Sequence, residues 1–384
     1  MPADGRLFLT EEQGMIRDMA RDFAARELAP HAAEWDRNGG FPKDMYKRMG
    51  ALGLMGMLVP EEYGGAEAGH LSYALAMEEI SAGDVGTASA MSVNNSLVCS
   101  GLAGFGSEDQ KDRFLKPLAQ GDMLGAFGLT EPHTGSDASA LRTRAVLDGN
   151  SFILNGSKQF ITNGAKADVA LIIAVTDPDA GKKGLSCFVV PTDMPGFTVL
   201  KVEEKLGQRA HDTAQLVFED IRLTPDLMLG EPGQGYRIAL SNLESGRIAI
   251  ASQALGAARA AYEAALAYAK ERETFGKPII EHQAVSFRLA DMATEIEAAR
   301  LLTHHAARLS DAGLPCIKEA SMAKLYASEM AERVCSNAIQ TLGGYGYLND
   351  FPVERYWRDV KVCQIYEGTS DVQRIVIGRA IAAE

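Results

Sequence analysis

The stretch "RAVLDGNSFILNGSKQFITNGAKADVALIIAVTD", residues 144–177, decides the fold, because it interrupts a chain that is otherwise rich in helix-forming residues. Its short β-branched and aromatic runs are separated by the turn pairs Asp148-Gly149, Asn155-Gly156 and Asn163-Gly164, at a spacing typical of hairpins. The later runs "LSCFVVP", "FTVLKVEE" and "AQLVFEDIRL" continue the strand pattern. We therefore predict a small β domain over residues 126–232.

Helical patterns lie on both sides of this β domain. The segment "TEEQGMIRDMARDFAARELAPHAAEW" opens with Thr10 and an acidic first turn, which is typical of a helix N-terminus. Further helices are expected at 42–58, 70–82, 86–104 and 107–119. From residue 233 onward three apolar stripes recur at helical spacing: Leu255, Ala258, Tyr262, Ala265 and Ala269; Leu289, Met292, Ile296 and Ala299; and Ala320, Ala323, Ala327, Met330, Val334 and Ala338. Their small residues suit close bundle packing, so we predict an all-α N-terminal domain at 1–125, a helical C-terminal domain at 233–384, and a last helix from about Ser370.

Composition limits the classes of function. The chain has 384 residues and a formal net charge of −13, which argues against nucleic acid and against an anionic membrane surface as partners. No run approaches the ~20 apolar residues of a membrane span, and the first residues contain no apolar signal core. The cysteines are odd in number, far apart and without a C-x-x-C pair, so we expect neither a disulfide framework nor a metal site, and a reducing compartment: Cys99, Cys187, Cys316, Cys335 and Cys363.

Common catalytic motifs are missing from the sequence. "GEPGQGYRIAL" (230–240) contains Gly233 and Gly235, but no glycine follows three residues later, so the dinucleotide-binding fingerprint fails. No Walker A motif and no G-x-S-x-G occur. Nicotinamide, ATP-dependent and α/β-hydrolase enzymes of the usual kinds are therefore disfavoured.

Four short stretches could carry chemistry, and each also has an ordinary structural interpretation. The loop 127–137, "FGLTEPHTGSD", could present hydroxyls and backbone N–H groups to an anion or a polar ring edge, or could be a plain turn. "QTLGGYGY" (340–347) has two glycines that a helix C-cap explains equally well. "RETFG" (272–276) carries an arginine that is solvated in most proteins. Glu367 in "QIYEGTSDVQR" would ordinarily be a surface acid ahead of a helix.

Taken together, these stretches resemble the acyl-CoA dehydrogenase family over nearly the whole chain. The matching segments fall in the family's order across all three parts: "LTEPHTGSD", "FITNGAKAD", "LESGRIAIASQALG", "RETFGKPIIEHQ", "QTLGGYGY" and "IYEGTSDVQR". "MSVNNSL" (91–97), "EEKLGQRA" (203–210) and "GRIAIASQALG" are most similar to the short-chain, butyryl-CoA branch. The resemblance implies a mainly α fold with an N-terminal helical domain, a middle β-barrel or sandwich and a C-terminal four-helix bundle, assembled as a homotetramer (a dimer of dimers).

The resemblance also implies one FAD per chain. The loop at 127–136 and the strand at 160–162 would hold the flavin, with Thr130 and Thr162 at the ring edge and Phe160 against the ring, where many relatives have tryptophan. Arg272 and Gln283, together with residues 340–344, would hold the pyrophosphate and adenosine of a neighbouring subunit's FAD, a role that suits the two-pronged arginine head. The complete expected set is Phe127, Leu129, Thr130, Gly135, Ser136, Phe160, Ile161, Thr162, Arg272, Phe275, Gln283, Gln340, Gly343, Gly344, Thr369 and Asp371.

On the substrate side, the resemblance implies an acyl-CoA thioester. The expected contacts are Ser136, Glu244, Ser245, Gly246, Arg247, Tyr366 and Gly368. Arg247 is a local cation for the polyanionic CoA end. Where many relatives read T-E-P-G-x-G-S-D, this chain has His133 and Thr134, which makes the loop bulkier.

The implied reaction is α,β-dehydrogenation of a short-chain acyl-CoA to the trans-2-enoyl-CoA in fatty acid β-oxidation. Glu367 would remove the α-proton while the β-hydrogen leaves as hydride to flavin N5, and the electrons would pass to electron-transfer flavoprotein. Some relatives carry the base just before the matching arginine, but that position here is Gly246, and Glu244 is not a substitute. Burial beside Tyr366 should raise the pKa of Glu367.

Several alternatives stay open at this point. A short branched-chain acyl-CoA is the second choice of substrate. An acyl-CoA oxidase would share the base but is usually longer; a nitroalkane oxidase-like enzyme would use aspartate; and a non-enzymatic homologue would be expected to lose the base or the flavin motifs. The compartment is expected to be the cytoplasm of a bacterium, or the mitochondrial matrix for a mature eukaryotic form.

Overall fold

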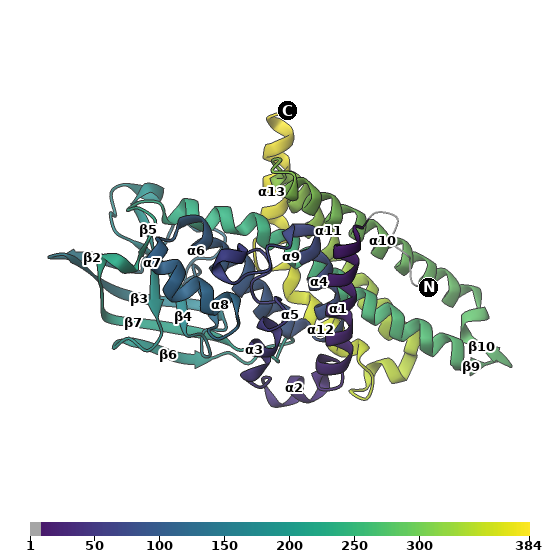
Figure 1. The fold of residues 1–384 in the computed structure, drawn as a ribbon. Helices are drawn as coiled ribbons and strands as arrows, with labels where there is room; N and C mark the ends of the chain where they lie inside the picture. The colour runs from purple at the N-terminus through teal and green to yellow at the C-terminus, as the bar shows by residue number, and fades with distance from the viewer. Residues whose placement is uncertain (1–8) are drawn as a thin grey trace.

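The computed structural model describes residues 9–384, except for the side chains of residues 242–244. Figure 1 shows three parts in a row, with a β-sheet at one end, short helices beside it and a bundle of long helices reaching away from it. Within residues 9–384 no helix is both long and apolar enough to cross a lipid bilayer. The expected mainly α fold with a central β part is confirmed.

The first part is helical. Thr10 caps the first helix in a capping box with Gln13, as the sequence pattern predicted. The α-helices are α1 Glu11–Phe23, α2 Ala32–Asn38, α3 Asp44–Gly50, α4 Gly69–Gly83, α5 Val85–Ser92, α6 Ser100–Phe105, α7 Glu108–Gln110 and α8 Lys116–Ala119. Short π-helical turns, Ala24–Leu28, Val93–Cys99 and Lys111–Leu115, continue some of them, and Glu61–Tyr63 forms a 3₁₀ turn.

The prediction of a helix over 42–58 is wrong for the second half of that range. Helix α3 ends at Gly50 and the chain then forms turns. Gly53 has a φ of 75°, which a right-handed helix does not accommodate, and the backbone N–H of Met57 donates 2.8 Å to the side-chain oxygen of Asn95 instead of to a helical carbonyl. The closely spaced glycines of this otherwise apolar segment could have predicted that the helix ends early.

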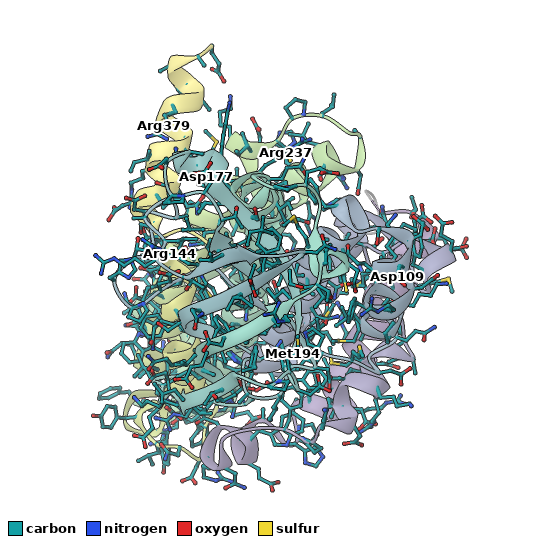
Figure 2. The ribbon with its side chains drawn as sticks, turned by 90° about the vertical axis from the view of Figure 1, so that its left-hand side faces the viewer. Asp109, Arg144, Asp177, Met194, Arg237 and Arg379 are labelled. Atoms are coloured by element: carbon teal, nitrogen blue, oxygen red, sulfur yellow. The ribbon has the colours of Figure 1, made fainter. Side chains whose placement is uncertain are left out.

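The second part is one eight-stranded sheet in the order β6-β7-β3-β2-β4-β5-β8, with β1 pairing parallel to β4. The strands are β1 Gly125–Gly128, β2 Arg144–Asp148, β3 Ser151–Thr162, β4 Val169–Val175, β5 Leu185–Pro191, β6 Phe197–Val202, β7 Thr213–Leu223 and β8 Met228–Leu229. Strands β2 and β4 pair through a single register position, Arg144 with Val175, so the sheet divides there into two halves. Figure 2 looks onto this sheet and labels Arg144, and the helices of the first part lie beside the sheet.

Only one of the three expected turn pairs closes a hairpin. Asp148-Gly149 joins the antiparallel strands β2 and β3, as predicted. Asn155 and Gly156 lie inside β3 at a register shift, where the Asn155 side chain exchanges hydrogen bonds with Asp220 of β7. Asn163 is buried and donates to the carbonyl of Gly125, so this pair anchors the end of β3 to β1. The sequence pairs therefore marked a bulge and an anchor as well as a turn.

The third part holds the long helices α9 Gly235–Glu271, α10 Gln283–Asp311 and α11 Ile317–Leu342, followed by α12 Val353–Val360 and α13 Ser370–Ala382. The predicted stripes of the long helices form one buried core, with Tyr262 packing partly exposed at its edge. A two-stranded hairpin, β9 Glu273–Thr274 and β10 Lys277–Pro278, links α9 to α10 at the end of the molecule farthest from the sheet (Figure 1).

The remaining connections are short 3₁₀ turns: Gly181–Gly184, Pro225–Leu227, Ile279–Glu281, Gly343–Tyr347 and Lys361–Gln364. The last of these leads into the segment that carries Glu367, between α12 and α13.

Helix α4 of the first part packs along α9 of the bundle, and buried ion pairs fix the two together. Glu78 and Glu79 of α4 are buried, and Arg259 of α9 pairs with both at 2.9 Å and 2.6 Å. Arg300 of α10 joins Glu78 at 2.9 Å. These ion pairs hold α4 against α9 and α10, and α4 and α9 are two of the helices that surround Glu367.

Candidate active site

Glu367 lies where three helices meet. Gly246 and Arg247 belong to α9, and Lys324 belongs to α11. The carboxylate of Glu367 is close enough to Arg247 and Lys324 for both positive charges to lower its pKa. Tyr73 of α4 completes the surroundings, since the charge of Glu367 adds to burial in raising the pKa of the tyrosine. The acid is therefore an internal group and not the surface acid of the ordinary interpretation.

The carboxylate of Glu367 has the properties of a base held ready to accept a proton. Its Oε2 is buried and accepts no hydrogen bond from any described residue. Burial raises the pKa of the Glu367 carboxyl to about 7, and the charges of Lys324 and Arg247 oppose that rise. A carboxyl group with a pKa near neutral pH can take a proton and later release it, so the geometry and the acidity agree with general-base chemistry.

Gly246 gives the carboxylate its room. A Cβ atom at Gly246 would lie 1.8 Å from Oε2 of Glu367, closer than any two such atoms can approach. The missing side chain at Gly246 therefore leaves a notch in the surface of α9, in which the carboxylate of Glu367 packs against the helix backbone. A glycine within a helix interior is destabilising by ~0.5–1 kcal/mol relative to alanine, and the notch explains why it is present.

We expect the substitution Gly246→Ala to displace Glu367 while improving the local helix propensity. The flavin-containing protein should keep its thermal stability within the few degrees that ~1 kcal/mol allows but lose at least ~10²-fold in the rate of substrate-dependent flavin reduction. Stopped-flow absorbance at the flavin band measures the rate. A variant with the wild-type rate would show that Glu367 does not need the notch.

The segment around Glu367 is held by a buried polar network. The hydroxyl of Tyr366 donates 2.6 Å to Gln253 of α9 and accepts from Gln208 at 3.3 Å. Gln208 lies between β6 and β7, so the network ties the segment both to the bundle and to the sheet. Thr369 caps α13, accepting from Val372, as the sequence suggested.

The other residues expected to contact substrate lie on α9. Arg247 is buried, and Ser245 is half-buried and within 3.1 Å of the His70 ring at the start of α4. The backbone of Glu244 lies in the same helix, but its side chain is outside the described residues. Ser136, expected to touch both substrate and flavin, is exposed on the loop after β1, and Gly368 lies directly after Glu367.

The loop at 127–136 is a rigid turn built on a buried ion pair. Phe127 and Leu129 begin it, and Glu131 and Thr134 exchange backbone hydrogen bonds of 2.9 Å and 3.0 Å. The Glu131 carboxylate accepts from the fully buried Lys158 at 2.8 Å, while Lys158 also donates to the carbonyl of Leu129 at 3.0 Å. The loop therefore presents Thr130, Gly135 and Ser136 outward from a fixed base.

Beside this loop, strand β3 places Phe160 outward in a strained conformation. Phe160 has a φ of 60° and is 64% exposed, at a register shift between Lys158 and Ile161. Ile161 is buried, and Thr162 pairs with Thr213 of β7. An exposed aromatic ring held by backbone strain, next to hydroxyl groups, suits the face and edge of a planar ring.

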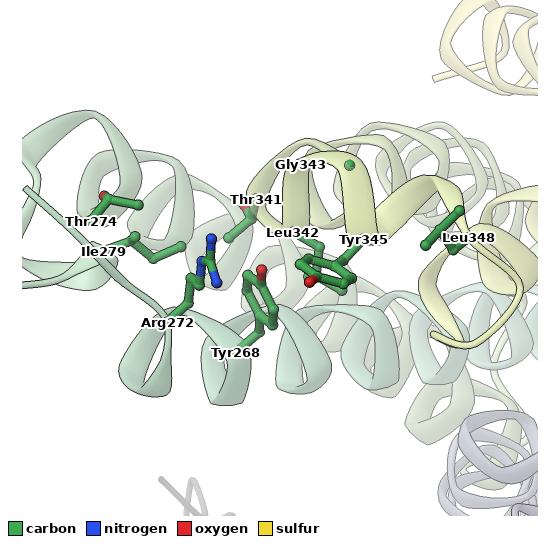
Figure 3. A pocket seen from close by; sticks show the side chains of 10 residues that line it. Tyr268, Arg272, Thr274, Ile279, Thr341, Leu342, Gly343, Tyr345 and Leu348 are labelled. Atoms are coloured by element: carbon green, nitrogen blue, oxygen red, sulfur yellow. The ribbon is translucent and has the colours of Figure 1, made fainter.

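Three members of the second expected FAD set, Arg272, Gly343 and Gly344, line a cavity of about 540 Å³ between α9 and the end of α11, and Gln283 and Gln340 are not among its lining residues. Figure 3 shows Arg272 beside Tyr268 in this cavity, with Tyr345 across from them. Arg272 ends α9 and its guanidinium is 5.9 Å from the centre of the Tyr345 ring. Gly343 and Gly344 line the same cavity, and the tip of the neighbouring hairpin carries Phe275, 97% exposed with a φ of 52°.

One chain does not bring the two sets together. The sheet with Phe160 and the β9–β10 hairpin next to Arg272 lie at opposite ends of the molecule (Figure 1). Gln283 starts α10 and Gln340 lies near the end of α11, and both are exposed at the bundle end; Asp371, in the first turn of α13, is exposed as well. Together the two sets offer the arginine, glycine, hydroxyl and aromatic groups that a flavin dinucleotide needs, so the residues fit FAD, divided between two surfaces.

Sequence reasoning missed several residues around the site. Lys158, Lys324 and Gln373 are fully buried polar side chains that contact the flavin loop or the Glu367 segment. Lys324 falls within the apolar stripe between Ala320 and Ala327, and a charged residue in such a stripe is a signal that could have been followed. Among residues 9–384 no cluster of His, Cys, Asp and Glu is arranged to hold a metal ion.

Comparison with known proteins agrees with this arrangement. Family models described as acyl-CoA dehydrogenase N-terminal, middle and C-terminal domains match residues 10–122, 126–221 and 233–382. The mitochondrial short-chain specific acyl-CoA dehydrogenase of Bos taurus is 50% identical over 369 residues, which are 96% of this chain and 90% of that protein.

Two solved structures share the fold. Butyryl-CoA dehydrogenase from Megasphaera elsdenii has 44% identity and a TM-score of 0.95, over 97% of this chain and 99% of that one. A chain from a structure described as electron transferring flavoprotein of Acidaminococcus fermentans has 49% identity and a TM-score of 0.96, over 98% and 99%.

Proposed function

The chain belongs to the acyl-CoA dehydrogenase family, whose members are FAD-dependent oxidoreductases, and we propose that it converts a short-chain acyl-CoA thioester to the trans-2-enoyl-CoA. The observation that carries the proposal is the buried carboxylate of Glu367, with its raised pKa and its oxygen Oε2 left without a partner among the described residues. The family and the FAD dependence expected from the sequence are confirmed, and the particular substrate and the residue roles are the proposal.

In this proposal Glu367 takes the α-proton of the thioester. Such a proton is far less acidic than a carboxyl group, so the developing enolate needs hydrogen-bond donors at the thioester oxygen. Gly368, with a φ of 90° and no side chain, allows the thioester to approach the backbone of this segment closely. FAD, when bound, supplies the hydride acceptor at N5 for the β-hydrogen. Tyr366 and the surrounding helices exclude water from the carboxylate.

The expected FAD residues keep their roles in the proposal. Thr130 and Thr162 would bond the ring edge and Phe160 would cover a face of the ring, while Arg272 would bind the pyrophosphate as a forked donor. Because the sheet that carries Phe160 and the β9–β10 hairpin next to Arg272 lie at opposite ends of the molecule, each FAD would be shared between two copies, as in the homotetramer that the sequence suggested. The division of the chain at residues 125 and 232 also stays a prediction.

The substitution Arg272→Ala tests the shared site. We expect it to lower FAD content several-fold and to weaken the assembly of the purified protein, because the arginine would bind a neighbour's cofactor and no described residue of the cavity supplies a second charge. Flavin absorbance per chain and size-exclusion chromatography with light scattering give the two readouts. Loss of FAD from an unchanged oligomer would point to a site within one chain, and full retention of both would remove Arg272 from the site.

Acyl preference is ranked by anaerobic bleaching of the flavin with a series of substrates. We expect butyryl- and hexanoyl-CoA to bleach faster than octanoyl-, isobutyryl- or isovaleryl-CoA. A faster reaction with the branched compounds would support the second candidate, a short branched-chain enzyme.

We also propose electron-transfer flavoprotein as the electron acceptor. A solved relative comes from a structure described by that name, and the resemblance of the sequence supports the same partner. Reduced enzyme with product bound should react slowly with oxygen and quickly with electron-transfer flavoprotein. Stoichiometric hydrogen peroxide at a comparable rate would favour an acyl-CoA oxidase. The proposed location is the bacterial cytoplasm or the mitochondrial matrix.

A further inference from the structure

We propose that Lys324, together with Gln373, is a positioning residue that clamps the backbone of the Glu367 segment and keeps the carboxylate ionised. This inference rests on the proposed function, because it concerns the residue named there as the base. Lys324 is fully buried in α11 and donates 2.7 Å to the carbonyl oxygen of Gly368. Gln373, fully buried in α13, donates to the carbonyls of Glu367 and Gly368 at 3.1 Å and 3.0 Å.

The hydrogen bonds from Lys324 and Gln373 stabilise an unusual backbone conformation of the Glu367 segment. Glu367 has a φ of 52°, in the left-handed region that non-glycine residues seldom adopt, and Gly368 follows with a φ of 90°. A strained residue of this kind persists only when its surroundings hold it. The donors from Lys324 and Gln373 draw two successive carbonyls towards α11 and α13. The peptide groups of residues 367 and 368 are therefore fixed in orientation, and the side chain of Glu367 is directed at Gly246.

A lysine does more here than a neutral donor could do. Both Lys324 and Gln373 satisfy carbonyl groups, yet only Lys324 brings a positive charge close to the Glu367 carboxylate. A buried ammonium group is costly unless a negative charge or several acceptors surround it, so a purely structural tie would be served as well by an amide. The charge is explained if the carboxylate must be ionised to act as a base.

The groups facing Glu367 come from all three helices packed against it. Lys324 of α11 and Arg247 of α9 lower the pKa of the carboxyl against the larger effect of burial, and the resulting pKa is about 7. Tyr73 of α4 faces it as a neutral group, because burial raises the pKa of its hydroxyl far above neutral pH. The charge of Glu367 is therefore set by two cations and a low-polarity environment.

The groups facing Lys324 are Cys363, Glu367, Arg247 and Glu329. Burial lowers the pKa of Lys324 to about 8, and the neighbouring acids oppose that effect. Burial holds Cys363 neutral by raising the pKa of its thiol to about 11. Lys324 is therefore mostly charged at the pH where Glu367 is half-ionised, and its influence fades as the pH passes about 8.

The substitution Lys324→Met tests the charge, with kcat/KM for flavin reduction by butyryl-CoA measured from pH 5.5 to 9.5. In the wild type the rate should rise with pH through a limb near pH 7, as Glu367 ionises. Without the cation the carboxyl pKa goes up, so the limb should move to higher pH by about 1 unit or more, the lower end of the ~1–3 units that a nearby opposite charge supplies. At pH 7 a shift of about 1 unit lowers the ionised fraction, and with it the rate, about 5-fold, and raising the pH should recover part of it.

Gln373→Met is the matched control, because it removes donors to the same carbonyls without removing a charge. It should slow flavin reduction by loosening the segment but leave the pH limb in place. If Lys324→Met fails to fold, Lys324→Gln keeps a donor without the charge and should show the same shift of the limb. An unshifted limb in the folded Lys324 variants, or an equal shift in Gln373→Met, overturns the inference. If wild-type enzyme is not reduced by any acyl-CoA, it is the proposed function that fails.

Discussion

Replacing Glu367 by glutamine is expected to slow the reduction of the flavin by butyryl-CoA at least ~10²–10⁴-fold, the range for a positioned general base. The effect should reach the high end, because a carbon acid gives up its proton slowly to water in a closed site. Glutamine keeps the volume of the side chain and the backbone donors, so FAD content and acyl-CoA binding should change little. Single-turnover stopped-flow under anaerobic conditions isolates the reduction step.

Glu244→Gln, at a residue of α9 that we propose contacts the substrate, is the control. Its position on α9 precedes the Gly246 notch, and we expect its loss to raise KM with kcat nearly unchanged, the signature of a ground-state contact. If Glu367→Gln reduced the flavin within a few-fold of the wild-type rate, Glu367 would not be the base, and an acid elsewhere on α9 would have to be considered.

The second large effect is expected from Lys158→Met. This lysine is fully buried, pairs with Glu131 at 2.8 Å and supports the 127–136 loop, for which we propose a role in flavin binding, through the carbonyl of Leu129. Burial opposes ionisation of Glu131, but the charge and hydrogen bond of Lys158 and the hydrogen bonds from Arg142 and Thr143 together outweigh it, so the pKa of the carboxyl is lowered. Removing one member of a buried ion pair costs ~3–5 kcal/mol. We expect the lower end, since Glu131 would keep two backbone donors. Urea unfolding of the FAD-loaded protein measures the change.

The double variant Lys158→Met/Glu131→Gln tests whether the stability lost in Lys158→Met comes from the unpaired charge of Glu131. With no uncompensated charge left, it should recover much of the lost stability, although the loop would remain looser and FAD binding weaker than in the wild type. A double variant as unstable as Lys158→Met would show that the pair itself contributes little and that the lysine acts through packing.

The helical parts could be predicted from the sequence because their signals are local. The capping box at Thr10 and the stripes of α10 and α11 depend only on residues a few positions apart, and the structure shows both. The turn pairs were less informative: Asn155-Gly156 became a bulge because its partner, Asp220, lies 65 residues further along the chain. No local pattern contains that contact.

In the candidate site, too, some features could be predicted from local sequence motifs and others depend on contacts between distant parts of the chain. The strained phenylalanine, the arginine at the end of α9 and the acid before α13 stand in recognisable motifs. The notch at Gly246 and the clamp from Lys324 depend on three helices meeting, which is a property of the folded chain. Lys324 was hidden because a lysine in a stripe of alanines resembles a solvated residue at the edge of a helix face until its burial is known.

Acyl-CoA dehydrogenation by this protein is measured most directly by an anaerobic titration of the FAD-loaded wild type with butyryl-CoA, followed by mass analysis of the acyl-CoA released. We expect the flavin band to bleach as butyryl-CoA is added and one trans-2-butenoyl-CoA to form for each flavin reduced. A flavin that stays oxidised with butyryl-CoA and with every other acyl-CoA of the series, or bleaching without the enoyl product, would contradict the proposed function.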